Sequence, residues 1–396
     1  YEILIGLVGS EMCIRDRTST GHVLQRSYYR GYAFRIDSHP RMNKDSIGKN
    51  KPGGSVSQQI DRALASGEQF GMLLLPGENE PRWFGKGYGS GMMTMEVAPW
   101  LAPFASRLVI GDGDTATTTT AAGTHPMPVH RHSTSHAEYI NGVEGVIGSC
   151  SKRSGKTVYS RAICGHIDPS TTPGRIARTL FEAHPNSLRF IYHTPQTGSW
   201  LGATPEILLD FDKTTGEFRT MALAGTRKKN GNSPWDEKNI RENRFVIDFI
   251  TDSLSRLGIT AEVSPLEEVA YGEIEHLCAH IHGTANPGQL PDIMDALNPT
   301  PALCGYPKTD AINDLRKFEA HPRGCYGGFV AFSSPRFYKA FVNLRCMQFD
   351  TSRYCIYGGG GITPQSVPDE EWAETEAKTT FLQQLANGCH IEKQIR

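Results

Sequence analysis

The chain has 396 residues, 21% of them charged, and a formal net charge of −1 with acids and bases interspersed. This balance excludes the one-signed basic surface that binds nucleic acid or anionic membranes, and no apolar run approaches the length of a membrane span. The nine cysteines are scattered without a Cys-x-x-Cys pair, so we expect a cytoplasmic monomer with no nucleic-acid or membrane partner.

Residues 1–17 are unlike a native N-terminus. They lack an initiator methionine, and no basic residues precede their apolar stretch, so they do not form a signal-peptide pattern. An ordinary first strand is one interpretation of this segment. The string resembles a translated sequencing adaptor, however, so we expect these residues to be non-native and leave them out of the fold argument.

The region 18–125 carries no motif that we can assign. It holds a helix pattern at 56–65 and a strand pattern at 70–75. Residues 115–126 are dominated by Thr and Ala, a composition typical of a surface loop. We expect 18–125 to form the N-terminal part of the fold and 130–390 to form the catalytic domain.

Periodic segments are dense after residue 135. Apolar spacing predicts helices at 135–150, 170–183 and 236–257, and strands at 156–164, 189–193, 199–209, 218–223, 261–263 and 276–282. The number of predicted strands is larger than a fold made of parallel strand–helix–strand units would contain. The pattern therefore predicts an α+β fold with large antiparallel sheets and helices packed outside.

The long helix predicted at 236–257 carries an acid on its apolar face. Val246, Ile250 and Leu254 mark the core-facing stripe, and Glu242 lies on the same stripe one turn earlier. A carboxylate buried without a partner is costly. Glu242 therefore predicts a polar cavity at the start of this helix.

Four successive glycines, residues 358–361, follow strands predicted at 340–349 and 353–357. Glycine exposes backbone N–H groups and lets a ligand approach closely. The flanking strand and helix argue against a flexible linker, and the run lacks both the Gly-Lys-Ser/Thr of a Walker loop and the spacing of a dinucleotide fingerprint. We predict a loop that binds a carboxylate or a phosphate.

The last helix, predicted at 366–385, also carries acids on its apolar face. Pro368 and an acidic first turn indicate where it begins. The apolar stripe of this helix lies near its C-terminal end. Three and four residues at a time toward the N-terminus, the same face carries charged residues: Lys378, Glu374 and Glu371. A solvated Glu374–Lys378 ion pair is the alternative. Two helices that both turn acids inward favour a shared, oxygen-rich Mg²⁺ site.

Histidines raise the alternative of zinc. They form two groups: His276, His280 and His282 on one face of a predicted strand, and His130, His132 and His136 in a loop segment. Neither group has cysteine or acidic partners at a metal-site spacing. We therefore interpret these histidines as structural or surface residues.

Five motifs in order resemble the chorismate-utilising enzymes, which include the anthranilate, aminodeoxychorismate, salicylate and isochorismate synthases. They are Gly-Ala-Thr-Pro-Glu-Ile-Leu at 202–208, Leu-Ala-Gly-Thr at 223–226, Asn-Pro-Thr-Pro-Ala-Leu-Cys-Gly-Tyr-Pro at 298–307, Arg-Gly-Cys-Tyr-Gly-Gly at 323–328, and the glycine run. The resemblance implies an α/β sandwich in which two large, mostly antiparallel sheets surround a central cleft, with helices outside.

One position in this family separates members that use water from members that use an amine. Lys156 leads the segment Lys-Thr-Val-Tyr-Ser-Arg, where anthranilate synthases usually carry glutamine. Aminodeoxychorismate synthases place a nucleophilic lysine there, but they lack the Pro-Thr-Pro-Ala-Leu-Cys-Gly form with Ala302 in place of a threonine. The sequence thus resembles the isochorismate synthases. Salicylate synthase and a non-catalytic carboxylate-binding relative are the alternatives.

The resemblance implies a reversible reaction in which water adds at C2 of chorismate and the C4 hydroxyl leaves. Lys156, with a depressed pKa, would be the general base and Glu206 the general acid. Mg²⁺ would be held by Glu242 and Glu374, with Glu371 as a further or water-mediated ligand. The pathways implied are those to menaquinone, catechol siderophores or salicylate.

The resemblance also implies which residues bind the substrate. Arg345 and Lys378 would clamp the enolpyruvyl carboxylate, assisted by backbone N–H groups of Gly359 and Gly360. His276 would lie near the ring. Two further residues, Tyr326 of the fourth motif and Glu319 shortly before it, could serve only to hold the cleft together. Asn243 stands where the family usually has histidine after the Glu242 position.

Overall fold

The computed structural model describes residues 54–388, except 90, 114–126, 154, 230–233 and 272–273, together with three strands nearer the N-terminus. The chain divides into two compact units, 1–47 and 48–396. The first contains β1 (Ile5–Val8), β2 (Glu11–Arg17) and β3 (Val23–Arg26), which pair in that order as an antiparallel sheet. Among the described helices, none is long and apolar enough to cross a membrane.

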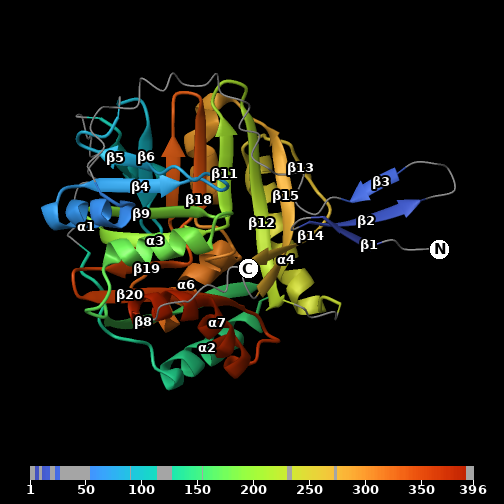
Figure 1. Cartoon of the computed structure of the whole chain (residues 1–396). Helices are drawn as coiled ribbons and strands as arrows, with labels where there is room; N and C mark the ends of the chain where they lie inside the picture. Colours follow the sequence, from blue (N-terminus) through green and yellow to red (C-terminus); the bar gives the residue numbers. More distant parts are fainter. Residues whose placement is uncertain are drawn as a thin grey trace. The chain divides into compact units, whose positions relative to one another are not determined.

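The second unit is built on two large sheets (Figure 1). One has eight strands, each antiparallel to its neighbours, in the order β16-β8-β20-β19-β10-β9-β4-β5. Its strands are β4 (Phe70–Leu74), β5 (Arg82–Gly85), β8 (Lys156–His166), β9 (Leu188–Thr194), β10 (Gly198–Thr204), β16 (Gly305–Tyr306), β19 (Cys346–Phe349) and β20 (Arg353–Ile362).

The other sheet has nine strands, again antiparallel, in the order β13-β15-β12-β11-β18-β17-β6-β7, and β14 also pairs with β15. Its strands are β6 (Thr94–Ala98), β7 (Leu108–Gly111), β11 (Ile207–Asp212), β12 (Glu217–Lys228), β13 (Ala261–Val263), β14 (Glu267–Tyr271), β15 (Ile274–Thr284), β17 (Phe329–Ser333) and β18 (Phe337–Val342). The prediction of two large antiparallel sheets is confirmed.

The helices pack against these sheets as amphipathic elements. They are α1 (Val56–Ser66), α2 (His136–Cys150), α3 (Pro173–Ala183), α4 (Glu237–Arg256), α5 (Leu290–Leu297), α6 (Lys308–Phe318) and α7 (Pro368–Ala386), with short 3₁₀ turns η2 (Phe104–Ser106) and η3 (Pro287–Gln289). Figure 1 shows α2 and α7 beside β8 and β20, while α4 packs on β12 and β15.

Capping residues explain where two of the predicted helices begin. Ser135 caps α2 in a reciprocal capping box with Glu138, and the Asp236 side chain accepts a hydrogen bond from the backbone N–H of Asn239 at the start of α4. Apolar residues of α3 and α7, including Leu180 and Leu382, fill a core against the first sheet. The helices predicted at 135–150, 236–257 and 366–385 are therefore confirmed within one or two residues.

Two predicted strands are each split into two. The segment 199–209 leaves the first sheet at Thr204 and enters the second at Ile207, because Pro205 has no N–H group with which to continue a ladder. The segment 340–349 breaks between β18 and β19, where Arg345 adopts a left-handed backbone with φ of 51°. Both breaks deliver a charged side chain to the region between the sheets, and the sequence prediction missed both.

The glycine run is not a loop, contrary to the prediction. Residues 358–361 continue β20 and pair with β8, from Gly358 opposite Arg161 to Ile362 opposite Thr157. On the other edge, β19 pairs only with residues 354–356. The glycine segment therefore lies beyond the end of β19, and it is flat and narrow because it carries no side chains.

Candidate active site

A pocket lies at the break between β10 and β11 and the glycine segment of β20. Its lining includes residues from β12, β15, α4 and α7, so both large sheets contribute. Eight of the predicted site residues line it: Glu206, Glu242, His276, Ala302, Arg345, Gly359, Gly360 and Lys378. The other three, Lys156, Glu371 and Glu374, lie behind this lining in contact with it.

Glu206 sits in the crossing between the two sheets and is 3% exposed. Its backbone is held by a hydrogen bond from the Val342 N–H to its carbonyl oxygen, 3.0 Å. Burial raises the pKa of Glu206 to about 8, although the positive charges of Lys156 and Lys378 pull it down. The carboxyl group is therefore mostly protonated at neutral pH and can donate a proton.

Lys156, the first residue of β8, is completely buried. Its Nζ donates a hydrogen bond to Glu242 Oε1 at 3.1 Å. An ammonium group removed from water needs such a partner, because an unpaired buried charge is strongly unfavourable. This contact links β8 to α4, which packs against the other sheet, and it brings the predicted base next to a predicted metal ligand.

His276 lies on β15 and is 8% exposed. Its Nδ1 is 3.2 Å from the Gly225 carbonyl oxygen and 3.1 Å from Thr226 Oγ1. Because a carbonyl can only accept, Nδ1 carries the proton. Burial, followed by the charges of Arg345 and Lys378, lowers the pKa of His276 to about 3, so the ring is neutral at physiological pH.

The carboxylate cluster, which we define as Glu242, Glu371 and Glu374, gathers around Gly360 and Gly361. A Cβ on Gly360 would lie 2.9 Å from Glu371 Oε2, and one on Gly361 would collide with Glu242 Oε1. Any larger residue at these two positions would push the acids away. The glycines are thus needed because they let the acids approach β20 closely. The sequence predicted that they would let a ligand approach instead.

Each acid of the carboxylate cluster is held by a lysine. Glu374 accepts a 2.6 Å hydrogen bond from Lys378, and Glu371 Oε1 accepts one of 2.6 Å from Lys238. Glu371 is 1% exposed, and its Oε2 has no hydrogen-bond partner in the described part of the chain. Burial and the neighbouring Glu374 carboxylate raise the pKa of Glu371, a penalty that a cation would relieve.

This donor set fits a hard divalent cation. All the ligands are carboxylate oxygens, and the buried Glu371 Oε2 lacks a partner. Within the described residues, however, the carboxylate oxygens of the three do not come together within 4.8 Å of one another. Mg²⁺ usually binds one or two protein carboxylates and keeps several waters, which suits a wider cluster of this kind.

Two positive side chains, Arg345 and Lys378, line the pocket. Arg345 reaches the pocket from its left-handed turn between β18 and β19. Lys378 Nζ donates to the Gly359 carbonyl oxygen at 2.9 Å, which fixes it over the glycine segment. A substrate with carboxylates would therefore meet two cationic side chains in the pocket.

Glu319 and Tyr326 occupy different positions relative to the pocket. Glu319 does not line the pocket: it accepts hydrogen bonds from Arg323 at 2.6 Å and from the Ser160 hydroxyl at 2.8 Å. Tyr326 does line the pocket, with its ring stacked 5.5 Å from that of Tyr357. The arrangement gives Glu319 a role in packing and places Tyr326 within reach of a ligand.

Sequence reasoning missed Lys238 and the role of Asn243. Lys238 lies one turn before Glu242 on α4, so the spacing of four residues was a signal that could have found it. Asn243 is fully buried, and its Nδ2 donates to carbonyl oxygens of Ala222, Ala224 and Leu277. It pins α4 to β12 and β15 and thereby positions Glu242.

The structure corrects one premise of the histidine interpretation, the lack of cysteine and acidic partners. His280 does have cysteine and acidic neighbours, because Cys278 and Glu267 lie beside it. Three of the other members pair singly with acids: His132 with Glu138, His136 with Asp369 and His282 with Glu262. Of the described residues, only the trio around His280 brings three potential ligand atoms within 4.8 Å of one another.

Comparison with known proteins places these features in a family. Residues 112–386 match the family model described as "Chorismate binding enzyme". Isochorismate synthase MenF of Pasteurella multocida (strain Pm70) is 28% identical over 211 residues, which are 50% of this chain and 48% of that protein. Isochorismate synthase EntC of Escherichia coli (strain K12) is 29% identical over 241 residues, 57% of this chain and 61% of that protein.

The chain thus spans about half the length of the curated relatives it matches. Among solved structures, MenF, the menaquinone-specific isochorismate synthase from Escherichia coli, superposes with a TM-score of 0.67 at 18% identity. The match covers 86% of this chain and 92% of that one. At this identity the likeness shows a shared fold, which is the predicted sandwich of two sheets with outer helices.

Proposed function

The chain belongs to the chorismate binding enzymes, and from this premise we propose that it is an isochorismate synthase, converting chorismate reversibly to isochorismate. The observation that carries the proposal is the combination, at one pocket, of a lining acid that is protonated at neutral pH with a buried lysine behind that lining. Glu206 is that acid and Lys156 that lysine. A module that only binds carboxylates would need neither. We propose that it works as a cytoplasmic monomer.

The reaction requires that the attacking water lose a proton and that the leaving C4 hydroxyl gain one. Water attacks C2 and loses a proton, the ring double bonds shift, and the C4 hydroxyl departs as water after it is protonated. In the proposed assignment, Lys156 in its neutral form takes the proton from the attacking water, and Glu206 supplies the proton to the leaving hydroxyl. Proton exchange with solvent restores both groups, so atoms and charge balance over the cycle.

Substrate binding follows from the charges around the pocket. Chorismate carries two carboxylates, and we assign the enolpyruvyl one to Arg345 and Lys378, a proposal supported by the presence of both cations in the pocket lining. The neutral ring of His276 offers a contact without adding a charge near Glu206. The glycine segment lets the ring of the substrate lie close to the backbone of β20.

We propose that Mg²⁺ is the cofactor, held by Glu242 and Glu374 with Glu371 as a direct or water-mediated ligand. When bound, it would neutralise the ring carboxylate of the substrate and withdraw electron density from the ring. Glu242 is also the hydrogen-bond acceptor of Lys156. A cation and the Lys156 ammonium therefore compete for the same carboxylate.

The direct test is to incubate the purified chain with chorismate and Mg²⁺ and to separate the products by liquid chromatography. We expect isochorismate, approached from either side of the equilibrium. Stoichiometric pyruvate release would identify a salicylate synthase instead. Binding of chorismate without any product would identify the non-catalytic relative. An amino product from added ammonium, or a substrate adduct on Lys156 in the intact mass, would point to amine chemistry.

A further inference from the structure

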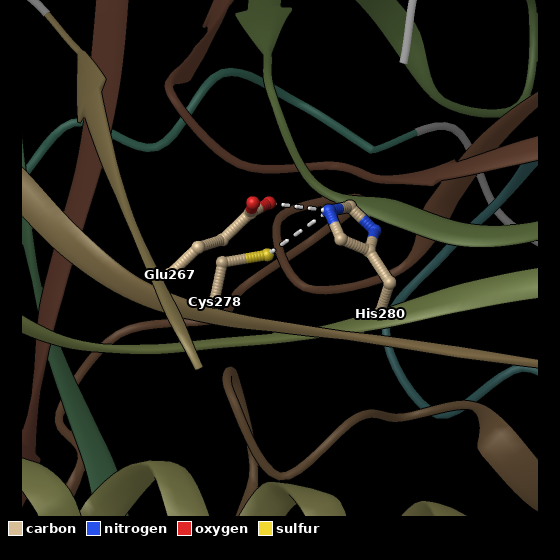
Figure 2. Close-up of side chains that lie close together, drawn as sticks. All are labelled: Glu267, Cys278 and His280. Atoms are coloured by element: carbon tan, nitrogen blue, oxygen red, sulfur yellow. Dashed lines mark hydrogen bonds and ion pairs between the residues drawn. The ribbon is translucent and has the colours of Figure 1, made fainter. Parts of the chain in front are cut away.

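A second group of potential ligands lies outside the pocket lining, on β14 and β15 (Figure 2). Glu267, Cys278 and His280 each direct one ligand atom toward the others, and these atoms all lie within 4.8 Å of one another. His280 Nε2 is 2.7 Å from Glu267 Oε1 and 3.8 Å from Cys278 Sγ. The trio thus has one carboxylate, one thiol and one imidazole around a single point.

The sheet holds this trio in place. Glu267 on β14 is directly opposite Cys278 on β15, and opposite residues of an antiparallel pair project from the same face. Cys278 and His280 are two residues apart on one strand, so they also share that face. All three ligand positions are therefore set by regular strand geometry, which costs less ordering entropy on binding than a loop would.

The backbone around His280 is held as well. The His280 N–H donates to Ser264 Oγ at 2.9 Å, and the Ser264 N–H donates to the His280 carbonyl oxygen at 2.8 Å. These two bonds fasten the segment before β14 to β15. They restrict the movement of the imidazole, as supporting hydrogen bonds do around known metal sites.

The chemistry of the trio selects a class of ion. Thiolate, imidazole and carboxylate together are the ligands of zinc, whereas Mg²⁺ and Ca²⁺ prefer oxygen alone. We propose that Glu267, Cys278 and His280 bind a borderline divalent transition-metal ion of the zinc type, with water as the fourth ligand. The site is separate from the proposed Mg²⁺ cluster and does not depend on the proposed function.

An ion can reach this site from the surface. The Glu267 side chain is 44% exposed and that of His280 19%, while Cys278 is buried beneath them. Burial and the nearby Glu267 carboxylate raise the pKa of the Cys278 thiol, so the metal-free protein carries a neutral thiol. Binding forms the metal–sulfur bond and releases the thiol proton to solvent.

Occupancy would stiffen one side of the pocket. His276 lies two residues before Cys278 on β15 and shares its face, and it is opposite Val269 of β14. An ion that ties β14 to β15 would therefore hold the strand that carries His276. Because the ion binds the folded chain, it should also raise the unfolding temperature.

The test uses Co²⁺ as a spectroscopic probe. The full chain, without a histidine tag, is reduced, stripped with EDTA, freed of chelator and titrated with Co²⁺. We expect a thiolate-to-cobalt charge-transfer band in the near ultraviolet that saturates at one equivalent of Co²⁺ bound at this site, that Zn²⁺ abolishes and that excess Mg²⁺ does not. The absence of this band at stoichiometric Co²⁺ would overturn the proposal.

Variants locate the site. Cys278→Ser should remove the charge-transfer band, and Glu267→Gln and His280→Gln should each weaken Co²⁺ binding by more than the roughly 10–100-fold that loss of an outer-shell partner costs. Because Cys278 is buried, its variant counts only if its circular dichroism matches that of the parent. If the Cys278→Ser variant is misfolded, the more exposed Glu267→Gln and His280→Gln variants decide the test.

His282→Gln is the matched control. His282 lies two residues after His280 on the same face of β15 and pairs with the exposed Glu262 at 3.3 Å, away from the thiol. It should leave both the band and the Co²⁺ affinity unchanged. A band that persists in Cys278→Ser, or a loss of affinity in His282→Gln equal to that in His280→Gln, would contradict the assignment.

Discussion

The carboxylate cluster and the crossing between β10 and β11 each contain a buried glutamate, but the surroundings of the glutamates differ between these two regions. In the cluster, Glu242 and Glu374 accept hydrogen bonds from lysines at 3.1 and 2.6 Å. In the crossing, burial dominates over the more distant lysine charges and raises the pKa of Glu206 to about 8. Burial therefore determines the protonation of Glu206, whereas Glu242 and Glu374 are each paired with a lysine.

Removing the acid or the lysine should have the largest effect. Glu206→Gln keeps the size of the side chain but cannot deliver a proton, and Lys156→Ala removes the proposed base. Each should lower kcat by roughly 10²-fold or more, the contribution of a general acid or base. Chorismate should still bind, because Arg345 and Lys378 remain. Steady-state kinetics together with a binding titration separate the two effects.

Either of two results would break the assignment. Near-normal turnover in Glu206→Gln would show that the buried acid is not the proton donor. Loss of chorismate binding in a folded Lys156→Ala variant would make the lysine a binding residue instead. Circular dichroism decides whether each variant is folded, which matters for Lys156 because its removal leaves Glu242 without its ion-pair partner.

The carboxylate cluster should respond to metal, and the crossing should not. We expect EDTA treatment to abolish activity and added Mg²⁺ to restore it, while Glu242→Gln and Glu374→Gln each remove it with the fold intact. The matched control is Glu376→Gln, an exposed acid on the same helix. Full turnover after exhaustive chelation would exclude the proposed metal role of the cluster.

The crossing should determine the alkaline limb of the pH profile. Glu206 donates a proton only while it is protonated, and its pKa is about 8. Activity should therefore fall as the pH rises through about 8, with no loss from His276, which stays neutral there. Initial rates at saturating chorismate across this range give the measurement. A rate that does not decline above pH 8 would show that Glu206 is not the acid.

The smallest expected effect is on stability. Folding raises the pKa of Glu206, so the folded chain binds this proton more tightly than the unfolded chain does. Stability conferred by the proton is present below the ordinary glutamate pKa and is lost as the pH rises toward about 8. Glu206→Gln should therefore gain unfolding temperature relative to the parent over this interval. A difference that is independent of pH would contradict the raised pKa.

Helical periodicity by itself located much of the site. The spacing from Val246 back to Glu242, and from Leu382 back to Glu371, depends only on 3.6 residues per turn, so these acids could be placed on inward faces. Pro368 and the acidic first turn likewise indicated where α7 begins. The motifs indicated the family and hence the sandwich, because their order along the chain is a property of sequence alone.

Tertiary structure decided what lies across a strand or between sheets. The glycine segment became strand because β8 offers a pairing partner, and Lys238 became the partner of Glu371 because α4 and α7 meet there. Glu267 came beside Cys278 through the register of β14 and β15, which local spacing does not encode. Periodicity gives the face on which a side chain lies, but its charge depends on burial and on neighbours brought from elsewhere in the chain.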